Sequence, residues 1–149
     1  MIERGRTTDA DVLADLWVDL ATDQLAHGSH LLPAENRENI RESLLRHAVA
    51  GTLFVAGEGD AIVGFVTCSV ETGGYEQDER RGMVENLYVV PERRDDGIGT
   101  ALLERAEAAL RERGCTVVAL DVMATNEDAR RFYERHGYDP HRVELEKEL

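Results

Sequence analysis

Apolar residues recur at helical spacing in two segments near the start of the chain. The first segment ends in the polar run 27–30, and its apolar stripe consists of Leu13, Leu16, Trp17 and Leu20. The second opens at Pro33 and closes at Gly51, residues that suit the two ends of a helix. Its stripe consists of Ile40, Leu44, Leu45 and Ala48. These patterns predict two amphipathic helices.

Short apolar runs bounded by turn residues predict strands at 2–7, 53–56, 61–70, 83–90, 116–122 and 143–149. The turn 57–60 joins the second run to the third, so these two form an antiparallel hairpin. The run 116–122 is almost continuously apolar, which is typical of a strand in the centre of a sheet. Residues 143–149 alternate between apolar and polar and predict a last strand.

Two more helices are predicted at 98–113 and 126–136, each followed by a glycine. The order of elements is therefore β-α-α-β-β-β-α-β-α-β. The strand–helix–strand unit 83–122 implies two parallel strands joined by a right-handed crossover. The expected fold class is α/β, more strictly α+β: a mixed, mostly antiparallel sheet of six or seven strands with helices on both faces.

Length and composition suit one domain. The chain has 149 residues, 42% of them hydrophobic, so residues 1–149 are expected to share one core. No run is apolar and long enough to cross a membrane, and no signal peptide is recognised, so a cytoplasmic location is the expectation. The two cysteines, Cys68 and Cys115, lie far apart inside apolar runs and are predicted to be buried thiols.

The chain is strongly acidic: 30 acidic residues face 17 basic ones, for a net charge of −13. Lys147 is the sole lysine, and the other basic residues are arginines. Nucleic-acid binding is disfavoured, because a phosphate backbone needs a basic surface. Abundant acid with almost no lysine resembles proteins of salt-loving organisms, in which salt screens the self-repulsion. The alternative is an acidic field that attracts a cationic substrate.

A glycine turn from Arg94 to Gly99 is the most informative segment. A strand leads into it and a helix leaves it, so the free amides of the first helical turn and the positive end of the helix dipole coincide. Because Gly97 and Gly99 lack side chains, a phosphate could approach this backbone closely. The same glycines could simply permit a tight turn. Neither a Walker A loop nor a dinucleotide-binding fingerprint fits, because the lysine of the first and the third glycine of the second are missing.

Two longer motifs give this turn its context. The run VENLYVVPERRDDGIGTALL at 84–103 resembles the acetyl-coenzyme A motif of the GNAT superfamily of N-acetyltransferases, which reads V-x-P, Q/R-x-x-G-x-G/A and then A-L-L. The run NEDARRFYERHGY at 126–138 resembles the second motif of that family, N-x-x-A-x-x-F-Y-E-x-x-G-F/Y. The order of elements also fits a GNAT-like fold, whereas neither motif reveals the acetyl acceptor.

The resemblance implies acetyl-coenzyme A as co-substrate, with its pyrophosphate on the glycine turn. The residues that would bind it there are Arg94, Asp95, Asp96, Gly97, Ile98, Gly99 and Thr100. In the family, the strand before the turn splays from its parallel neighbour, so backbone groups of Leu87 and Val89 would face the acetyl group and the pantetheine arm. The Leu87 N–H would donate to the oxyanion, and Asn126 would hydrogen-bond the cofactor.

The resemblance also implies two catalytic residues. Tyr133 matches the tyrosine that protonates the departing thiolate, a role open to a phenol with an ordinary pKa of about 10. Glu85 is the candidate base through water, because an ammonium must lose a proton before it attacks a thioester. Strand alternation would place Glu85 on one face with Leu87 and Val89. The plainer interpretations are a packed ring for Tyr133 and a solvated carboxylate for Glu85.

Asp95 and Asp96 stand where family members often carry Arg, Lys, Gln or Gly. Two carboxylates beside a pyrophosphate repel it at low salt, although Arg93 and Arg94 would offset part of that repulsion. We therefore expect cofactor affinity to improve with ionic strength, the reverse of ordinary phosphate binding.

The expected reaction is acetyl transfer to a primary amine of a small molecule or a protein N-terminus, by direct attack without an acyl-enzyme. Two other classes stay open: a non-catalytic coenzyme A-binding sensor or interaction module, and a nucleotide-binding βαβ protein. His27 and His30 have the spacing of a metal pair but no third ligand, so no metal is expected. No nucleic-acid or membrane partner is expected, and a homodimer is compatible with the family.

Overall fold

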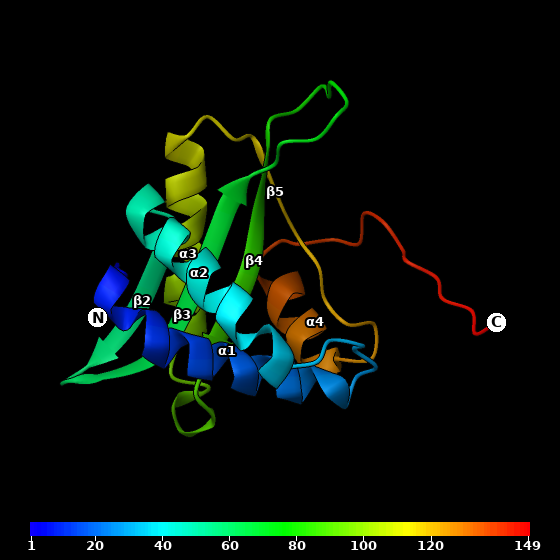
Figure 1. The fold of residues 1–149 in the computed structure, drawn as a ribbon. Helices are drawn as coiled ribbons and strands as arrows, with labels where there is room; N and C mark the ends of the chain where they lie inside the picture. The colour runs from blue at the N-terminus through cyan, green and yellow to red at the C-terminus, as the bar shows by residue number, and fades with distance from the viewer.

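Five strands form one sheet in the order β1-β2-β3-β4-β5 in this computed structural model, which describes all 149 residues (Figure 1). The strands are β1 (Ile2–Arg4), β2 (Leu53–Glu58), β3 (Ala61–Val70), β4 (Arg81–Val89) and β5 (Val117–Leu120). Neighbouring strands are antiparallel except β4 and β5, which are parallel. A single parallel pair differs from the repeated βαβ units of a nucleotide-binding fold.

Helices cover both faces of the sheet, as predicted. The α-helices are α1 (Ala10–Leu25), α2 (Arg37–Ala50), α3 (Ile98–Glu112) and α4 (Glu127–Arg135). Short 3₁₀ turns are η1 (Thr7–Asp9), η2 (Ala34–Asn36) and η3 (Pro91–Arg93). Figure 1 shows α1 and α2 on one face and α3, the crossover between β4 and β5, on the other. None of the helices combines the length and apolar character that crossing a membrane requires.

Each face has its own hydrophobic core, because alternate strand residues point to opposite faces. On the α1–α2 face, Phe65 and Tyr88 pack against residues such as Trp17. The core on the α3 face includes both cysteines, Cys68 and Cys115, which are buried free thiols as predicted. Burial raises the pKa of the Cys68 thiol to about 11, so this cysteine is a poor nucleophile near neutral pH.

The predicted sheet of six or seven strands is too large. Residues 143–149 form no strand; they belong to an exposed tail that follows α4 and leads away from the sheet (Figure 1). Val143 and Leu145 are 79% and 88% exposed. Alternation describes a strand only where a neighbouring edge supplies hydrogen bonds, and this tail pairs with none. The prediction that 116–122 is a central strand is also wrong: β5 lies at the edge of the sheet and has a neighbour, β4, on one side only.

A β-bulge interrupts β4 at Glu85. Thr67 lies opposite Asn86 and Cys68 lies opposite Val84, so Glu85 is the extra residue that has no partner on β3. A bulge resets the alternation of the strand: the residues after it point to the opposite face from the one that strict alternation predicts.

The bulge corrects the predicted orientation of Glu85. Leu87 and Val89 pack against the core on the α3 face, whereas Glu85 lies beside His47 of α2. Asn86 points to the same side as Glu85, because its Oδ1 accepts a hydrogen bond from Trp17 Nε1 of α1 at 3.2 Å. Glu85 therefore faces α1 and α2, and the prediction that it shares a face with Leu87 and Val89 is wrong.

Beyond the bulge, β4 parts from β5. The last parallel pair is Val84 with Leu120, while β4 continues to Val89. Val90 N donates to Val63 O at 2.9 Å, so by the alternation of an antiparallel ladder Leu87 and Val89 turn their peptide groups away from β3. These groups line an edge without a neighbouring strand, which is the splay that the resemblance implies.

Gly64 of β3 lies opposite Val89, in the part of β4 that follows the bulge. A Cβ at Gly64 would lie 2.8 Å from the Tyr88 carbonyl oxygen and 3.1 Å from Leu102 Cδ1. Gly64→Ala should therefore lower the free energy of unfolding by about 1–3 kcal/mol, as overpacking does, in urea denaturation. At Gly74 a Cβ would meet nothing within 4 Å, so Gly74→Ala should match the wild type. Equal stability of the two variants would contradict the packing described.

Candidate active site

The loop between β4 and α3 carries six consecutive backbone N–H groups that no protein atom accepts, from Asp95 to Thr100. The first helical hydrogen bond of α3 runs from Ala101 N to Gly97 O, at 3.1 Å. A helix N-terminus leaves such donors unpaired and adds the positive end of its dipole. The first three of these residues are exposed and the last three are half-buried, and such a row of free donors is suited to an anion.

Two left-handed residues bend this loop. Gly97 has φ +82°, and Asp95 has φ +67°, the one non-glycine residue of the chain with positive φ. A Cβ at Gly97 would meet nothing within 4 Å, so the space beside its amide is open. Gly99 has a different role: a Cβ there would lie 3.4 Å from the Phe132 ring, so the missing side chain lets α4 approach the first turn of α3.

The charged side chains of the loop are partly compensated. Arg93 pairs with Asp96, at 3.2 Å between Nε and Oδ2, and also with Glu58, the last residue of β2. Asp95 has no cationic partner within salt-bridge distance. Of the two arginines expected to offset the loop carboxylates, Arg93 therefore pairs with Asp96, and the charge of Asp95 stays uncompensated.

Arg94 points away from the amides of the loop. Its Nε donates to the Val89 carbonyl oxygen at 3.0 Å, and its Nη2 lies 3.4 Å from Asp23 Oδ2 of α1. The guanidinium also lies 5.4 Å from the centroid of the Tyr88 ring. Arg94 thus holds the end of β4 against α1, and its backbone N–H donates to Pro91 O, so neither its side chain nor its amide is left for a phosphate.

Two residues of the second motif contribute to the ends of α4. Asn126 is the N-cap of α4, and its Oδ1 accepts from Ala129 N at 3.2 Å, so its side-chain NH₂ is the group left for a ligand. At the other end, His136 Nε2 lies 3.0 Å from Thr100 Oγ1. The hydroxyl expected to serve a phosphate is thus already in a hydrogen bond. Sequence reasoning missed His136, whose only signal is its place just before the glycine that follows α4.

Tyr133 lies half-buried on the α3 face of the sheet. Its ring packs edge-on against Phe132 and Tyr138, at centroid distances of 5.2 and 5.9 Å. Burial raises the pKa of Tyr133 to about 12, so the phenol keeps its proton over the whole physiological range. Tyr138 donates to Glu107 Oε2 at 2.6 Å, whereas the Tyr133 hydroxyl has no protein partner and is free to donate elsewhere.

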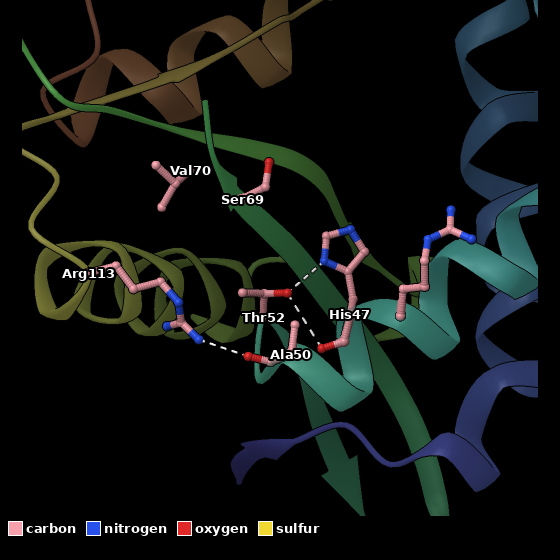
Figure 2. A pocket seen from close by; sticks show the side chains of 7 residues that line it. His47, Ala50, Thr52, Ser69, Val70 and Arg113 are labelled. Atoms are coloured by element: carbon pink, nitrogen blue, oxygen red, sulfur yellow. Dashed lines mark hydrogen bonds between the residues drawn. The ribbon is translucent and has the colours of Figure 1, made fainter. Parts of the chain in front are cut away.

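Glu85 lies on the opposite face, beside a pocket at the end of α2. Glu85 Oε1 is 3.5 Å from His47 Nε2, and His47 Nδ1 is 2.7 Å from Thr52 Oγ1. Figure 2 shows the His47 ring directed at Thr52 in this pocket, which is lined by Arg46, His47, Ala50, Thr52, Ser69, Val70 and Arg113. Burial lowers the pKa of His47, and the negative charge of Glu85 opposes this shift. The imidazole beside Glu85 is therefore mainly neutral. No sequence motif marks His47.

The two histidines with metal-pair spacing have separate partners. His27 Nδ1 lies 3.3 Å from Thr125 Oγ1, and His30 Nε2 lies 3.0 Å from Glu146 Oε1 in the tail. No three His, Cys, Asp or Glu side chains gather where they could hold a metal ion.

Known proteins share this sequence over most of its length. Residues 13–138 match the acetyltransferase (GNAT) family. An uncharacterized N-acetyltransferase of Archaeoglobus fulgidus is 36% identical over 96 residues, which are 64% of this chain and 65% of that protein. N-alpha-acetyltransferase 30 of Homo sapiens is 34% identical over 85 residues, which are 57% of this chain and 23% of that protein. The matches thus span less than two thirds of these relatives.

Solved structures share the fold. A GCN5-related N-acetyltransferase from Ralstonia eutropha JMP134 superposes with a TM-score of 0.79 at 28% identity, over 100% of this chain and 97% of that one. PaiA N-acetyltransferase from Thermoplasma acidophilum, in complex with coenzyme A, gives 0.80 at 20% identity, over 97% and 92% of the two chains. The family match includes both motifs, the splayed strand and the loop of free amides, and the chain belongs to the GNAT family of acetyltransferases.

Proposed function

We propose that residues 1–149 form a single-domain N-acetyltransferase that moves an acetyl group from acetyl-coenzyme A to a primary amine of a small molecule or a protein N-terminus. The observation that carries the proposal is the row of unpaired amides from Asp95 to Thr100, placed directly after the unpaired edge of β4. A pyrophosphate fits this row because its oxygens only accept hydrogen bonds. The coenzyme A bound to PaiA N-acetyltransferase, which has the same fold, supports the choice of cofactor.

The edge of β4 suits the rest of the cofactor. The peptide group of Leu87 and the N–H of Val89 can hydrogen-bond the amides of a pantetheine arm as a neighbouring strand would, whereas the Val89 carbonyl oxygen already accepts from Arg94 Nε. One of these groups, the Leu87 N–H, would donate to the acetyl oxygen as it becomes negative during attack. A preorganised donor of this kind is worth about 3 kcal/mol.

Glu85 and Tyr133 would act from opposite faces of the sheet. Glu85, on the α1–α2 side, would accept the proton of the incoming ammonium through water. Tyr133, on the α3 side, would donate its proton to the departing thiolate.

Tyr133→Phe should lower kcat by about 10²–10⁴-fold, typical of a lost general acid, with little change in the KM for acetyl-coenzyme A. The ring and its packing remain, so the loss reports the hydroxyl alone. Since the Tyr133 pKa is about 12, loss of its proton should not limit the wild-type rate below that pH. Acetyl-coenzyme A consumption against a panel of amines measures these rates.

Glu85→Gln should lower kcat most at low pH, where most of the amine is protonated, and recover as the pH approaches the pKa of the amine. Glu112→Gln, an exposed change at the far end of α3, is the matched control. Unchanged turnover in both Glu85→Gln and Tyr133→Phe with every acceptor would contradict these roles. Tight coenzyme A binding without turnover in the wild type would indicate a non-catalytic sensor instead.

Coenzyme A binding should tighten as salt rises from low to molar concentration, because salt screens the uncompensated Asp95 charge beside the phosphates. Asp95→Asn should bind more tightly at low salt and lose most of this dependence, and asparagine tolerates the positive φ of this position. Asp78→Asn, an exposed change in the distant loop between β3 and β4, should respond to salt as the wild type does. Calorimetric titration measures the Kd, and wild-type binding that weakens steadily with salt would contradict the prediction. Improvement with salt would also support adaptation of this acidic surface to high salt.

A further inference from the structure

His136 joins the end of α4 to the loop of free amides. Its ring packs on Phe132 with a centroid distance of 4.5 Å, and its Nδ1 lies 2.8 Å from the Phe132 carbonyl oxygen. Its Nε2 lies 3.0 Å from the hydroxyl of Thr100, the last residue in the row of unpaired amides. The imidazole is thus the group directly behind one end of the proposed pyrophosphate site.

The partners of His136 fix where its protons lie. A carbonyl oxygen can only accept, so Nδ1 must carry a proton and donate to Phe132 O. In the neutral ring Nε2 then has only a lone pair, and the Thr100 hydroxyl must donate to it. This hydrogen bond occupies the single proton of Thr100, so its oxygen presents only lone pairs to the loop.

That arrangement conflicts with a bound phosphate, whose oxygens also present only lone pairs. Protonation of His136 resolves the conflict. The Nε2–H would donate to Thr100 Oγ1, and the Thr100 proton would turn toward the phosphate, while the Nδ1–H stays on Phe132 O. The imidazolium would also add a positive charge behind the anion.

We propose that His136 is a positioning residue which couples pyrophosphate binding at Thr100 to the uptake of one proton from solvent. The proposal rests on the acetyl-coenzyme A site proposed above and assigns that site a pH-dependent affinity. His136 touches neither the acetyl group nor the amine, so its effect should fall on cofactor affinity and the KM for acetyl-coenzyme A and leave kcat largely unchanged.

Charged residues on the surrounding elements act in both directions on His136. By position in the chain, Arg135, next to His136, opposes its protonation, whereas Glu104, one helical turn after Thr100 on α3, and Asp95 and Asp96, in the loop before Thr100, favour it. Asp96 is already paired with Arg93. A bound pyrophosphate adds negative charge on one side only, so its binding should favour the protonated imidazole.

The sign of the pH dependence follows from this linkage. Affinity is greatest at low pH, where the proton is already in place. As the pH rises, the Kd should increase by at most about tenfold per pH unit, because one proton is linked to binding.

Isothermal titration with coenzyme A, in buffers of different ionisation enthalpy at one pH, counts the protons taken up. Dephospho-coenzyme A is the second probe, because it lacks the phosphate monoester, which itself titrates near pH 6. His136→Gln keeps an N–H donor that can reach Thr100 and does not titrate. This variant should therefore take up fewer protons than the wild type when it binds either probe. His141→Gln, in the exposed tail, is the matched control and should behave as the wild type does.

Thr100 provides an independent pair of variants. Thr100→Ser keeps the hydroxyl and should keep the proton uptake, whereas Thr100→Val should lose it as His136→Gln does. Equal uptake in the wild type and His136→Gln, or full uptake in Thr100→Val, would overturn the coupling while leaving the proposed function intact. A wild type that fails to bind coenzyme A at all would overturn the proposed function and this inference together.

Discussion

The parting of β4 from β5 is the constraint on which the rest of the site depends. An unpaired edge inside a sheet exposes peptide groups that normally seek another strand. Here the edge is held in place from its other side: Asn86 accepts from Trp17 and donates to Thr67 of β3, and Arg94 anchors the end of β4 to α1. The strand can therefore stay open toward β5 without losing its own position.

The bulge at Glu85 determines what lies on each side of that edge. Because Val84 packs in the α3 core, strict alternation without a bulge would place Leu87 and Val89 with Glu85 on the α1–α2 face. With the bulge, Glu85 meets solvent and His47 on one face, and the other face is left to the apolar surroundings that keep Tyr133 protonated. One inserted residue thus separates a wet, ionised region from a dry, neutral one.

Local signals in the sequence were enough to predict the helices, the first five strands, the parallel crossover and the loop of free amides, because periodicity and turn residues act over short distances. The bulge gave no such signal, since a two-residue period does not reveal a single insertion. The alternating tail, 143–149, looked like a strand because the sequence does not show whether an edge is available to pair with it. The hydrogen bond from Thr100 to His136 joins residues 36 positions apart, and no local rule predicts it.

The scarcity of lysine has a consequence for the protein itself. A guanidinium keeps its proton at any physiological pH and so is a poor acyl acceptor, whereas a lysine amine is a good one once deprotonated. A surface that carries its positive charge on arginine therefore offers almost nothing for a neighbouring thioester to modify. Lys147, in the exposed tail, is the one side-chain amine of the chain, and self-acetylation of side chains would be confined to it.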